Sequence, residues 1–560
     1  MDDAVDRGRA LVDAYWEGLL ENDPLLGTLV GDERFDDRLP DPGEEGRARR
    51  EALHRRALQD LDGIDRSAVR DVGVRTALDM LEAIARRDLA EIEHRLDRLQ
   101  VVSHLSGPGQ LLGELGSLQR ADTPERLDRY LARLAATPVF FDALAEVARD
   151  GVRAGVTAPR VVVERAVAQV ERLLATPADA SPAIMPVPGS DSAGRERVTR
   201  VLRESAMPAL EGFLATLREY LPHAPETIGL CALPGGEAMY AAEILSWTTL
   251  DLEDRAVHQL GVEDLARIQE ERQRCAERLG FPDPATALTE LSASGRNTIA
   301  SKEELVRLAE DQVRRGWEAA PGFFGRLPKQ GCEVRLVEEF READMPFAFY
   351  QPPSEDGSRQ GIYYVNGYEL ADRPLHHLPS TTYHEANPGH HFQIAIEQEM
   401  GDRPSLKRFG GLLAGAAFAE GWGLYSERLA DEMGLLLDDV ERLGMLDAQA
   451  HRAARLIVDT GIHAFGWSRD RAVTELEEAA VPHVDAEIET DRYITLPGQA
   501  LAYKIGQFEI ERLRAEATER EGAGFSLPVF HDRLLALGSL PLRALRRELD
   551  DRSGSDQVTA

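Results

Sequence analysis

The chain has 560 residues, of which 43% are hydrophobic and 29% are charged, a composition typical of soluble globular proteins. Its formal net charge of −33 at pH 7 argues against nucleic acid and anionic membrane surfaces as partners, because both would repel it. This length predicts roughly two to four compact units, or one large helical body around a cleft.

The termini and the cysteines predict a cytoplasmic protein. The N-terminus is acidic and lacks the basic start and apolar core of a signal peptide. No stretch approaches the roughly 20 apolar residues that a membrane span requires. The three cysteines are far apart and odd in number, so the sequence indicates no disulfide framework. The sequence gives no indication of the oligomeric state.

Helical periodicity dominates residues 1–330, which we expect to form an N-terminal helical region. Val74–Leu99 and Thr123–Ala148 place apolar residues three and four positions apart, with charges between them. Thr123 before a proline, and Ser301 three residues before a glutamate, are typical of helix starts. Pro177–Gly194 is rich in proline, serine and glycine and predicts a loop.

The period changes after Lys329. Cys332–Val337 alternates polar and apolar residues, and Phe347–Tyr350 and Gly361–Asn366 are aromatic and β-branched. These segments predict short strands, the last two joined by a turn over Pro352–Gln360. We expect one small antiparallel sheet immediately before the next helix.

Helical pattern resumes over Ser380–Glu397, Phe409–Asp431 and Val440–Gly466. We expect residues 331–549 to form a catalytic region that includes the small sheet, and residues 550–560 to form a polar tail. The predicted fold class is therefore mainly α, a large helical body around a deep cleft with one small antiparallel β-sheet.

His384-Glu385 resembles the beginning of the zinc-binding pattern H-E-x-x-H. In that pattern, residues four apart share a helix face, so two imidazoles meet one metal while the glutamate between them acts as a base. Here Pro388 stands where the second histidine would be, and the next histidines are His390 and His391. Neither spacing can chelate one ion on an undistorted helix.

Pro388-Gly389 predicts a break in this helix, because proline removes a backbone donor and its ring clashes with the preceding turn. Two looped-out residues would bring His390 to the place of the missing ligand. We therefore favour His384 and His390 as metal ligands, with His391 as the alternate. The competing interpretation is a kinked core helix with incidental histidines.

Glu420 is the best candidate for a third ligand. A catalytic zinc site usually has three protein ligands and one open position. Glu420 lies in an apolar, glycine-rich segment, where burying a carboxylate is costly unless it is paired or bound to metal. Glu427, seven residues later, is the second choice, or else an acceptor for a ligand histidine. A buried structural ion pair at Glu420 is the alternative.

Such a site predicts hydrolysis of a carbonyl compound, with zinc as the cofactor and Glu385 as the general base. Candidate donors to the developing oxyanion are His463 and Tyr503. Arg492 and Tyr493 follow an acidic run, and either could bind a substrate carboxylate or pair at the surface.

The strand Gly361–Asn366 directly precedes the His-Glu helix. In gluzincin peptidases the sheet edge beside this helix pairs with the extended substrate backbone. Tyr363 and Tyr364 are therefore candidate substrate contacts, unless they only pack an aromatic hairpin. A second polar stripe either lines the cleft or faces solvent, and comprises His451, Arg455 and Asp459.

Together these residues resemble a bacterial family known as domain of unknown function number 885. The resemblance rests on motifs in the same order along the chain: H-E-A-x-P-G-H-H-x-Q at His384–Gln393, E-G-W-x-L-Y-x-E at Glu420–Glu427, V-D-T-G-I-H at Val458–His463 and P-G-Q-A-L-x-Y-K at Pro497–Lys504, with Leu233–Glu237 and Pro353–Tyr364 also similar.

The resemblance implies a zincin-like, mostly helical fold akin to oligopeptidases of the neurolysin and angiotensin-converting-enzyme type. It also implies one zinc ion bound by His384, one of the paired histidines and Glu420. Dipeptidyl peptidase three has a related extension that ends in Gly-His, which favours His390 after Gly389.

We expect a zinc metallopeptidase that cleaves short peptides. The alternatives are a metal-dependent hydrolase acting on an amide or ester of a non-peptide metabolite, and a helical binding protein without catalysis.

Overall fold

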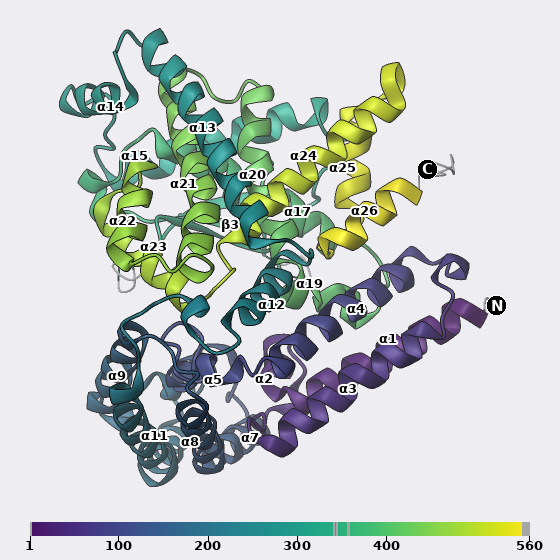
Figure 1. Cartoon of the computed structure of the whole chain (residues 1–560), viewed down its shortest axis with the longest axis vertical. Helices are drawn as coiled ribbons and strands as arrows, with labels where there is room; N and C mark the ends of the chain where they lie inside the picture. The colour runs from purple at the N-terminus through teal and green to yellow at the C-terminus, as the bar shows by residue number, and fades with distance from the viewer. Residues whose placement is uncertain (1–2, 340–341, 343–344, 355–358, 552–560) are drawn as a thin grey trace.

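The computed structural model describes residues 3–339, 342, 345–354 and 359–551. The chain is helical almost throughout, with one three-stranded sheet (Figure 1). The predicted mainly α class with one small sheet is confirmed. Part of the predicted turn Pro352–Gln360 and most of the predicted tail lie outside the described residues.

The first helices occupy the lower part of Figure 1, from purple to teal. They are α1 Asp3–Asn22, α2 Pro24–Leu29, α3 Glu44–Asp62, α4 Val72–Glu93, α5 Asp97–Gln100, α6 Leu111–Leu118, α7 Pro124–Ala135, α8 Thr137–Ala154, α9 Arg160–Ala175, α10 Ser192–Val201, α11 Met207–Tyr220 and α12 Gly236–Thr248. The predicted helix Thr123–Ala148 is two helices, because Pro138 begins a new first turn in α8. The predicted helix Val74–Leu99 is also interrupted, at Arg95, whose φ is 54°.

The later helices form the upper part. They are α13 Asp254–Arg278, α14 Pro284–Ala293, α15 Lys302–Ala319, α16 His377–Glu385, α17 His390–Gln398, α18 Ser405–Phe409, α19 Gly411–Ala414, α20 Ala416–Glu432, α21 Asp439–His463, α22 Arg469–Glu478, α23 His483–Thr495, α24 Leu501–Glu521, α25 Leu527–Leu535 and α26 Leu542–Asp551. Helix α13 packs along α21, and α15 packs against α16. Helices on the two sides of residue 330 are thus in contact, and the predicted division into regions stays a prediction.

The sheet consists of β1 Cys332–Leu336, β2 Ala348–Gln351 and β3 Gly361–Val365, in the order β1-β3-β2. Strand β3 pairs antiparallel with β2 and parallel with β1, so the predicted purely antiparallel sheet is wrong. All five residues of β3 are buried. A continuous apolar run is typical of a strand that is covered on both faces, which accounts for the central place of β3.

Helices α20 and α24 cross at unusually short range. A Cβ atom on Gly421 would lie 2.3 Å from the carbonyl carbon of Gly506, and one on Gly506 would lie 1.8 Å from the carbonyl oxygen of Ala417. Only glycine permits this approach of two backbones. The crossing fixes the position of α20, which carries Glu420. None of the described helices is both long and apolar enough to cross a membrane.

Candidate metal centre

The helix is interrupted between α16 and α17, as the sequence predicts. Helix α16 ends at Glu385, α17 begins at His390, and the peptide bond between Asn387 and Pro388 is cis. The indole Nε1 of Trp422, on α20, donates hydrogen bonds of 3.0 and 3.1 Å to the carbonyls of Pro388 and the next residue. The break is thus fixed by a buried side chain from a different helix.

Gly389 lies at the tightest point of this break. A Cβ atom there would lie 1.8 Å from the carbonyl oxygen of His384 and 2.4 Å from that of Tyr383. Because no other residue can approach the end of α16 so closely, Gly389 lets the chain fold back and begin α17 beside it.

The fold-back brings two imidazoles and one carboxylate together. Oε2 of Glu420 lies 3.6 Å from Nε2 of His384 and 3.8 Å from Nε2 of His390. The two rings are 4.8 Å apart between centroids and nearly perpendicular, at 89°. Ligand atoms about 2.1 Å from a tetrahedral zinc ion would lie about 3.4 Å apart, so these residues fit such an ion with small adjustments.

His391 points away from this triad of His384, His390 and Glu420. Its Nδ1 lies 2.8 Å from the hydroxyl of Tyr350, and its Nε2 lies 3.0 Å from the carbonyl oxygen of Gln330. Both ring nitrogens are therefore engaged with the sheet side of the molecule, and the geometry favours His390 over His391.

A buried chain of polar side chains orients His384. Its Nδ1 lies 2.8 Å from Oε1 of Glu427, whose other oxygen accepts a hydrogen bond of 2.9 Å from the amide of Gln449. Gln449 accepts in turn from Lys504, which is fully buried and pairs with Asp264 at 2.9 Å. Such partners fix the ring orientation of a metal-binding histidine and raise its basicity.

Sequence reasoning identified Glu427 but missed Gln449 and Lys504. A lysine within the otherwise apolar stretch Leu501–Gly506 was a usable signal, since burying an ammonium group requires a partner.

The imidazole of His384 lies directly on Gly423 of α20. A Cβ atom at this position would lie 2.5 Å from Cε1 and 2.6 Å from Nε2 of the ring. Gly423 therefore leaves the space that the ring occupies, one helical turn after Glu420.

The titration of the triad follows from its burial and its charges. Burial opposes the charge on His384, but hydrogen bonds to Glu420 and Glu427 raise the pKa of this histidine to about 10. Burial also opposes the charge on Glu420, but the two histidines hold its pKa at about 2. Burial and the neighbouring His384 lower the pKa of His390 to about 4. Without metal, the triad therefore holds an ion pair between His384 and Glu420.

Glu385 is half-buried at the end of α16. Burial raises its pKa to about 7, and the charge of His384 opposes this shift. Arg452 of α21 is close enough for its charge to lower the pKa of Glu385 as well. A carboxyl group that titrates near neutral pH suits a general base.

His463 does not reach the triad. It is buried, its Nε2 lies 3.0 Å from the carbonyl oxygen of Tyr493, and its Nδ1 faces the backbone nitrogen of Leu230 at 3.4 Å. Burial lowers its pKa to about 4. It follows Gln449 by fourteen residues on α21, about 21 Å along the axis. The oxyanion role predicted for His463 is therefore withdrawn.

Tyr363 and Tyr364 are not at an exposed sheet edge, because β3 is the central strand. Tyr363 is fully buried, with its hydroxyl 3.2 Å from that of Thr382. Tyr364 is also buried and stacks on Phe349, at 4.8 Å between ring centroids. The prediction that they contact substrate at an edge strand is wrong.

The remaining predicted residues are Arg492, Tyr493 and Tyr503, and they lie near one another. Tyr493 is buried, while Arg492 and Tyr503 are partly exposed. The guanidinium group of Arg455, from α21, lies 4.5 Å above the ring centre of Tyr503. Arg455 also donates a hydrogen bond of 3.0 Å to the hydroxyl of Tyr493.

Asp459, on α21, accepts hydrogen bonds from α12 and from the segment before α24. Its Oδ1 accepts hydrogen bonds of 2.6 Å from the hydroxyl of Tyr240 and 3.0 Å from the backbone of Gly498. The side chain is fully buried, and burial raises its pKa to about 7. Asp459 is therefore a structural acceptor between α12, α21 and the start of α24.

Asp459→Asn should become more stable relative to the wild type as pH rises. A folded-state pKa raised above the unfolded value gives stability at low pH that is lost as pH rises through about 7, and the amide removes this loss. Three pKa units correspond to about 4 kcal/mol, of which about 3 kcal/mol falls between pH 5 and pH 8. Urea unfolding of both proteins at these two pH values measures the difference, and a pH-independent difference contradicts the assignment.

A second group of potential ligands, His376, His377 and Asp447, lies at the beginning of α16. Asp447 already pairs with Arg272 at 2.7 Å, and Nε2 of His376 lies 3.1 Å from the same carboxylate. Asp447 thus already has a guanidinium partner, whereas within the described part of the chain the ion pairs of Glu420 are with His384 and His390 alone, so the triad is the better candidate for a metal site.

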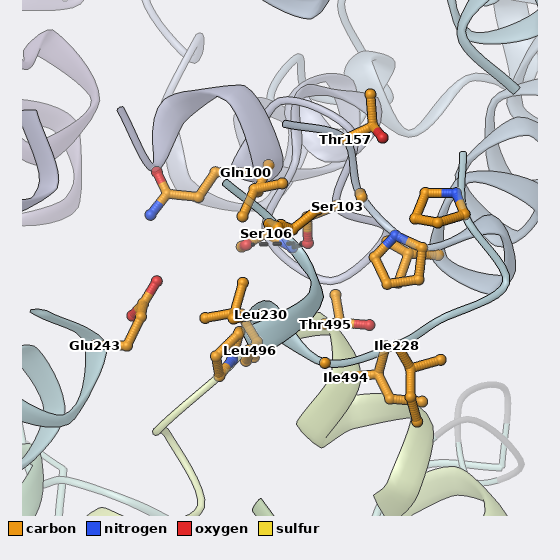
Figure 2. Close-up of a pocket in the computed structure, with 18 of the residues that line it drawn as sticks. Gln100, Ser103, Ser106, Thr157, Ile228, Leu230, Glu243, Ile494, Thr495 and Leu496 are labelled. Carbon is orange, nitrogen blue, oxygen red and sulfur yellow. Dashed lines mark hydrogen bonds between the residues drawn. The ribbon is translucent and has the colours of Figure 1, made fainter. Parts of the chain in front are cut away.

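A cavity of about 380 Å³ lies elsewhere, between the N-terminal helices and the segment that follows α23. Figure 2 shows Glu243 and Gln100 on one side of it, and Ile228 and Ile494 on the other. None of the triad residues lines this cavity, so it is not the cleft predicted around the histidines.

Comparison with known proteins gives a family and a fold. The family described as "Bacterial protein of unknown function (DUF885)" matches residues 24–549. None of the curated proteins matches the chain. A "putative lipoprotein" from Colwellia psychrerythraea has a crystal structure similar over 98% of this chain and 99% of its own, with a TM-score of 0.88 and 24% identity. A similarly described lipoprotein of unknown function from Shewanella oneidensis covers 96% of this chain and 98% of its own, with a TM-score of 0.78 and 19% identity.

These two structures correct the predicted location. Both proteins are described as lipoproteins, which are anchored to a membrane by lipid. The cytoplasmic location expected from the sequence is contradicted by these neighbours and is withdrawn. At this level of identity, their likeness otherwise shows the fold alone.

Proposed function

The chain belongs to this bacterial family of unknown function, and we propose from the geometry of the site that the protein is a zinc-dependent hydrolase with a zincin-like centre, acting on short peptides. The observation that carries the proposal is the convergence of His384, His390 and Glu420 across a helix break, with Glu385 adjacent to the first ligand. An incidental histidine cluster would not need the buried chain of hydrogen bonds, from Glu427 to Lys504, that orients His384.

In this proposal, His384, His390 and Glu420 hold one zinc ion, which when bound polarises a substrate carbonyl and makes water more acidic. Glu385 accepts the proton of the attacking water and then delivers it to the leaving nitrogen. Tyr503 is the residue we place beside the developing oxyanion, since its ring lies next to Arg455, whose charge acts on Glu420.

The zinc content of two neighbouring variants tests the proposed centre. The wild type, purified without chelator, should contain about one equivalent of zinc. His390→Ala should lose it, because two ligands and a water bind zinc far more weakly than three. His391→Ala should keep it, since the structure turns this ring towards Tyr350. Metal analysis by mass spectrometry measures both variants.

Cleavage of a diverse peptide mixture, followed by mass spectrometry, tests the reaction. Chelation should abolish cleavage, and added zinc should restore it. Zinc far below one equivalent in the wild type, or equal zinc in the two histidine variants, would refute the centre. Turnover of simple esters or acyl amides without peptide cleavage would instead favour a non-peptide substrate.

A further inference from the structure

A basic cluster of α21 and α23 shares a single acidic partner. Arg455 Nη2 lies 2.9 Å from Oε2 of Glu489, and Arg492 Nη2 lies 2.7 Å from the same oxygen. The hydroxyl of Tyr493 also donates to this oxygen, at 2.6 Å. One carboxylate oxygen therefore receives hydrogen bonds from two guanidinium groups and a phenol.

The charges of this cluster do not balance. Two guanidinium ions share one carboxylate, while the other carboxyl groups that their charges reach, Glu420 and Asp459, already pair with His384 and Tyr240. Burial, together with the charge of Arg455, lowers the pKa of His451 to about 3, and burial raises the pKa of Tyr493 above its usual value. Within the cluster, one guanidinium group therefore lacks a carboxylate of its own, in a protein whose net charge is −33. A buried charge is costly unless it is paired.

Two of the N–H groups in the cluster also lack acceptors. Nη1 of Arg455 and Nε of Arg492 are buried and have no hydrogen-bond partner among the described residues. Arg455 is only 5% exposed, whereas the side chains of Arg492 and Glu489 are 23% and 18% exposed. The cluster therefore has a deep, fixed donor and a rim that solvent reaches.

The cluster lies close to the metal triad. Arg455 follows Gln449, which touches Glu427, by six residues on the same helix, or about 9 Å along its axis. The charge of Arg455 also lowers the pKa of Glu420. One residue of an extended peptide spans about 3.5 Å, so a chain end bound here would be a few residues from the triad.

We propose that Arg455 and Arg492 bind the C-terminal carboxylate of the peptide substrate, so that the protein removes one or two residues from free C-termini. The inference rests on the proposed hydrolase function and specifies its substrate class. A carboxylate suits these two nitrogens, since one of its oxygens can accept a charge-assisted hydrogen bond from Nη1 of Arg455 and the other from Nε of Arg492. The bound carboxylate balances the charge that Glu489 leaves uncompensated.

Matched N-acetylated hexapeptides that differ only in a C-terminal acid or amide test this specificity. The wild type should cleave the acid with a kcat/KM at least about 30-fold higher than the amide, since truncating one partner of a buried charge pair has an effect of this order. Products should be shortened by one or two residues. Equal cleavage of acid and amide would overturn the proposal.

Arg455→Gln should reduce this ratio to nearly one, mainly by raising KM for the acid, and the remaining Arg492–Glu489 pair keeps the cluster neutral. Arg442→Gln is the control, because Arg442 lies on the same helix but pairs with Asp431 at 2.9 Å, away from the cluster. Arg492→Gln tests the same prediction from α23 if the first variant does not fold. An unchanged ratio in folded cluster variants overturns the assignment.

Binding separates this inference from the proposed reaction. If the wild type cleaves neither hexapeptide nor any member of the diverse peptide mixture, the peptidase proposal fails, and calorimetric titration of the same two hexapeptides decides the carboxylate site. Preferential binding of the acid that Arg455→Gln removes supports the site, whereas equal binding or no binding overturns it.

Discussion

Glu385→Gln is expected to abolish peptide hydrolysis while leaving zinc bound. The amide has nearly the shape of the carboxylate but cannot accept a proton from water. The group of converging ligand atoms comprises His384, His390 and Glu420 and does not include Glu385, so the metal should remain. General acid–base catalysis contributes about 10²- to 10⁴-fold, and kcat should fall by that factor.

The same substitution at Glu427 provides the contrast. Glu427 accepts from the ring nitrogen of His384 that faces away from Glu420, so Glu427→Gln should weaken zinc binding by about 10- to 100-fold. Turnover per bound zinc should change much less than in Glu385→Gln. Zinc content and single-turnover cleavage, measured on both variants, distinguish the two roles. Undiminished turnover in Glu385→Gln contradicts its assignment as the base.

The predictable part of the site is local in the chain. Proline and glycine at 388 and 389 restrict the backbone whatever surrounds them, so the helix break follows from sequence alone. The break in turn favours His390. The isolated carboxylate of Glu420 in an apolar segment was informative for the same reason, because its burial has few acceptable solutions.

The parts that could not be predicted depend on contacts between distant segments. The sequence shows that Gly361–Val365 is apolar, but β1 takes its place beside this strand only in the folded chain. The helix of His463 is also evident, yet only the packing of α21 shows that its C-terminal end lies far from the triad. Gln449 and Lys504 act through partners on other helices, and neither belongs to a local metal pattern.

Glycine at position 423 allows a prediction that tests the geometry of the centre without changing any ligand. Gly423→Ala would place a methyl carbon about 2.5 Å from the ring of His384. This distance is too short for two carbon atoms that are not bonded to each other. Gly423 lies between Glu420 and Glu427 on α20, so the methyl group pushes the ring off the helix that carries both of its carboxylate partners. We expect zinc affinity to fall by at least about tenfold, and the free energy of unfolding to fall by about 1–3 kcal/mol.

Gly212→Ala is the matched control, because Gly212 lies in α11 with no atom within 4 Å of the added methyl group. Alanine is the better helix former, so this variant should be more stable by up to about 1 kcal/mol with unchanged zinc affinity. Zinc titration with a competing chelator and urea unfolding measure both effects. If Gly423→Ala binds zinc as tightly as the wild type, His384 does not hold the metal from the position described. The ring of His384 can then reach the metal from another position, and the triad as a rigid centre is refuted.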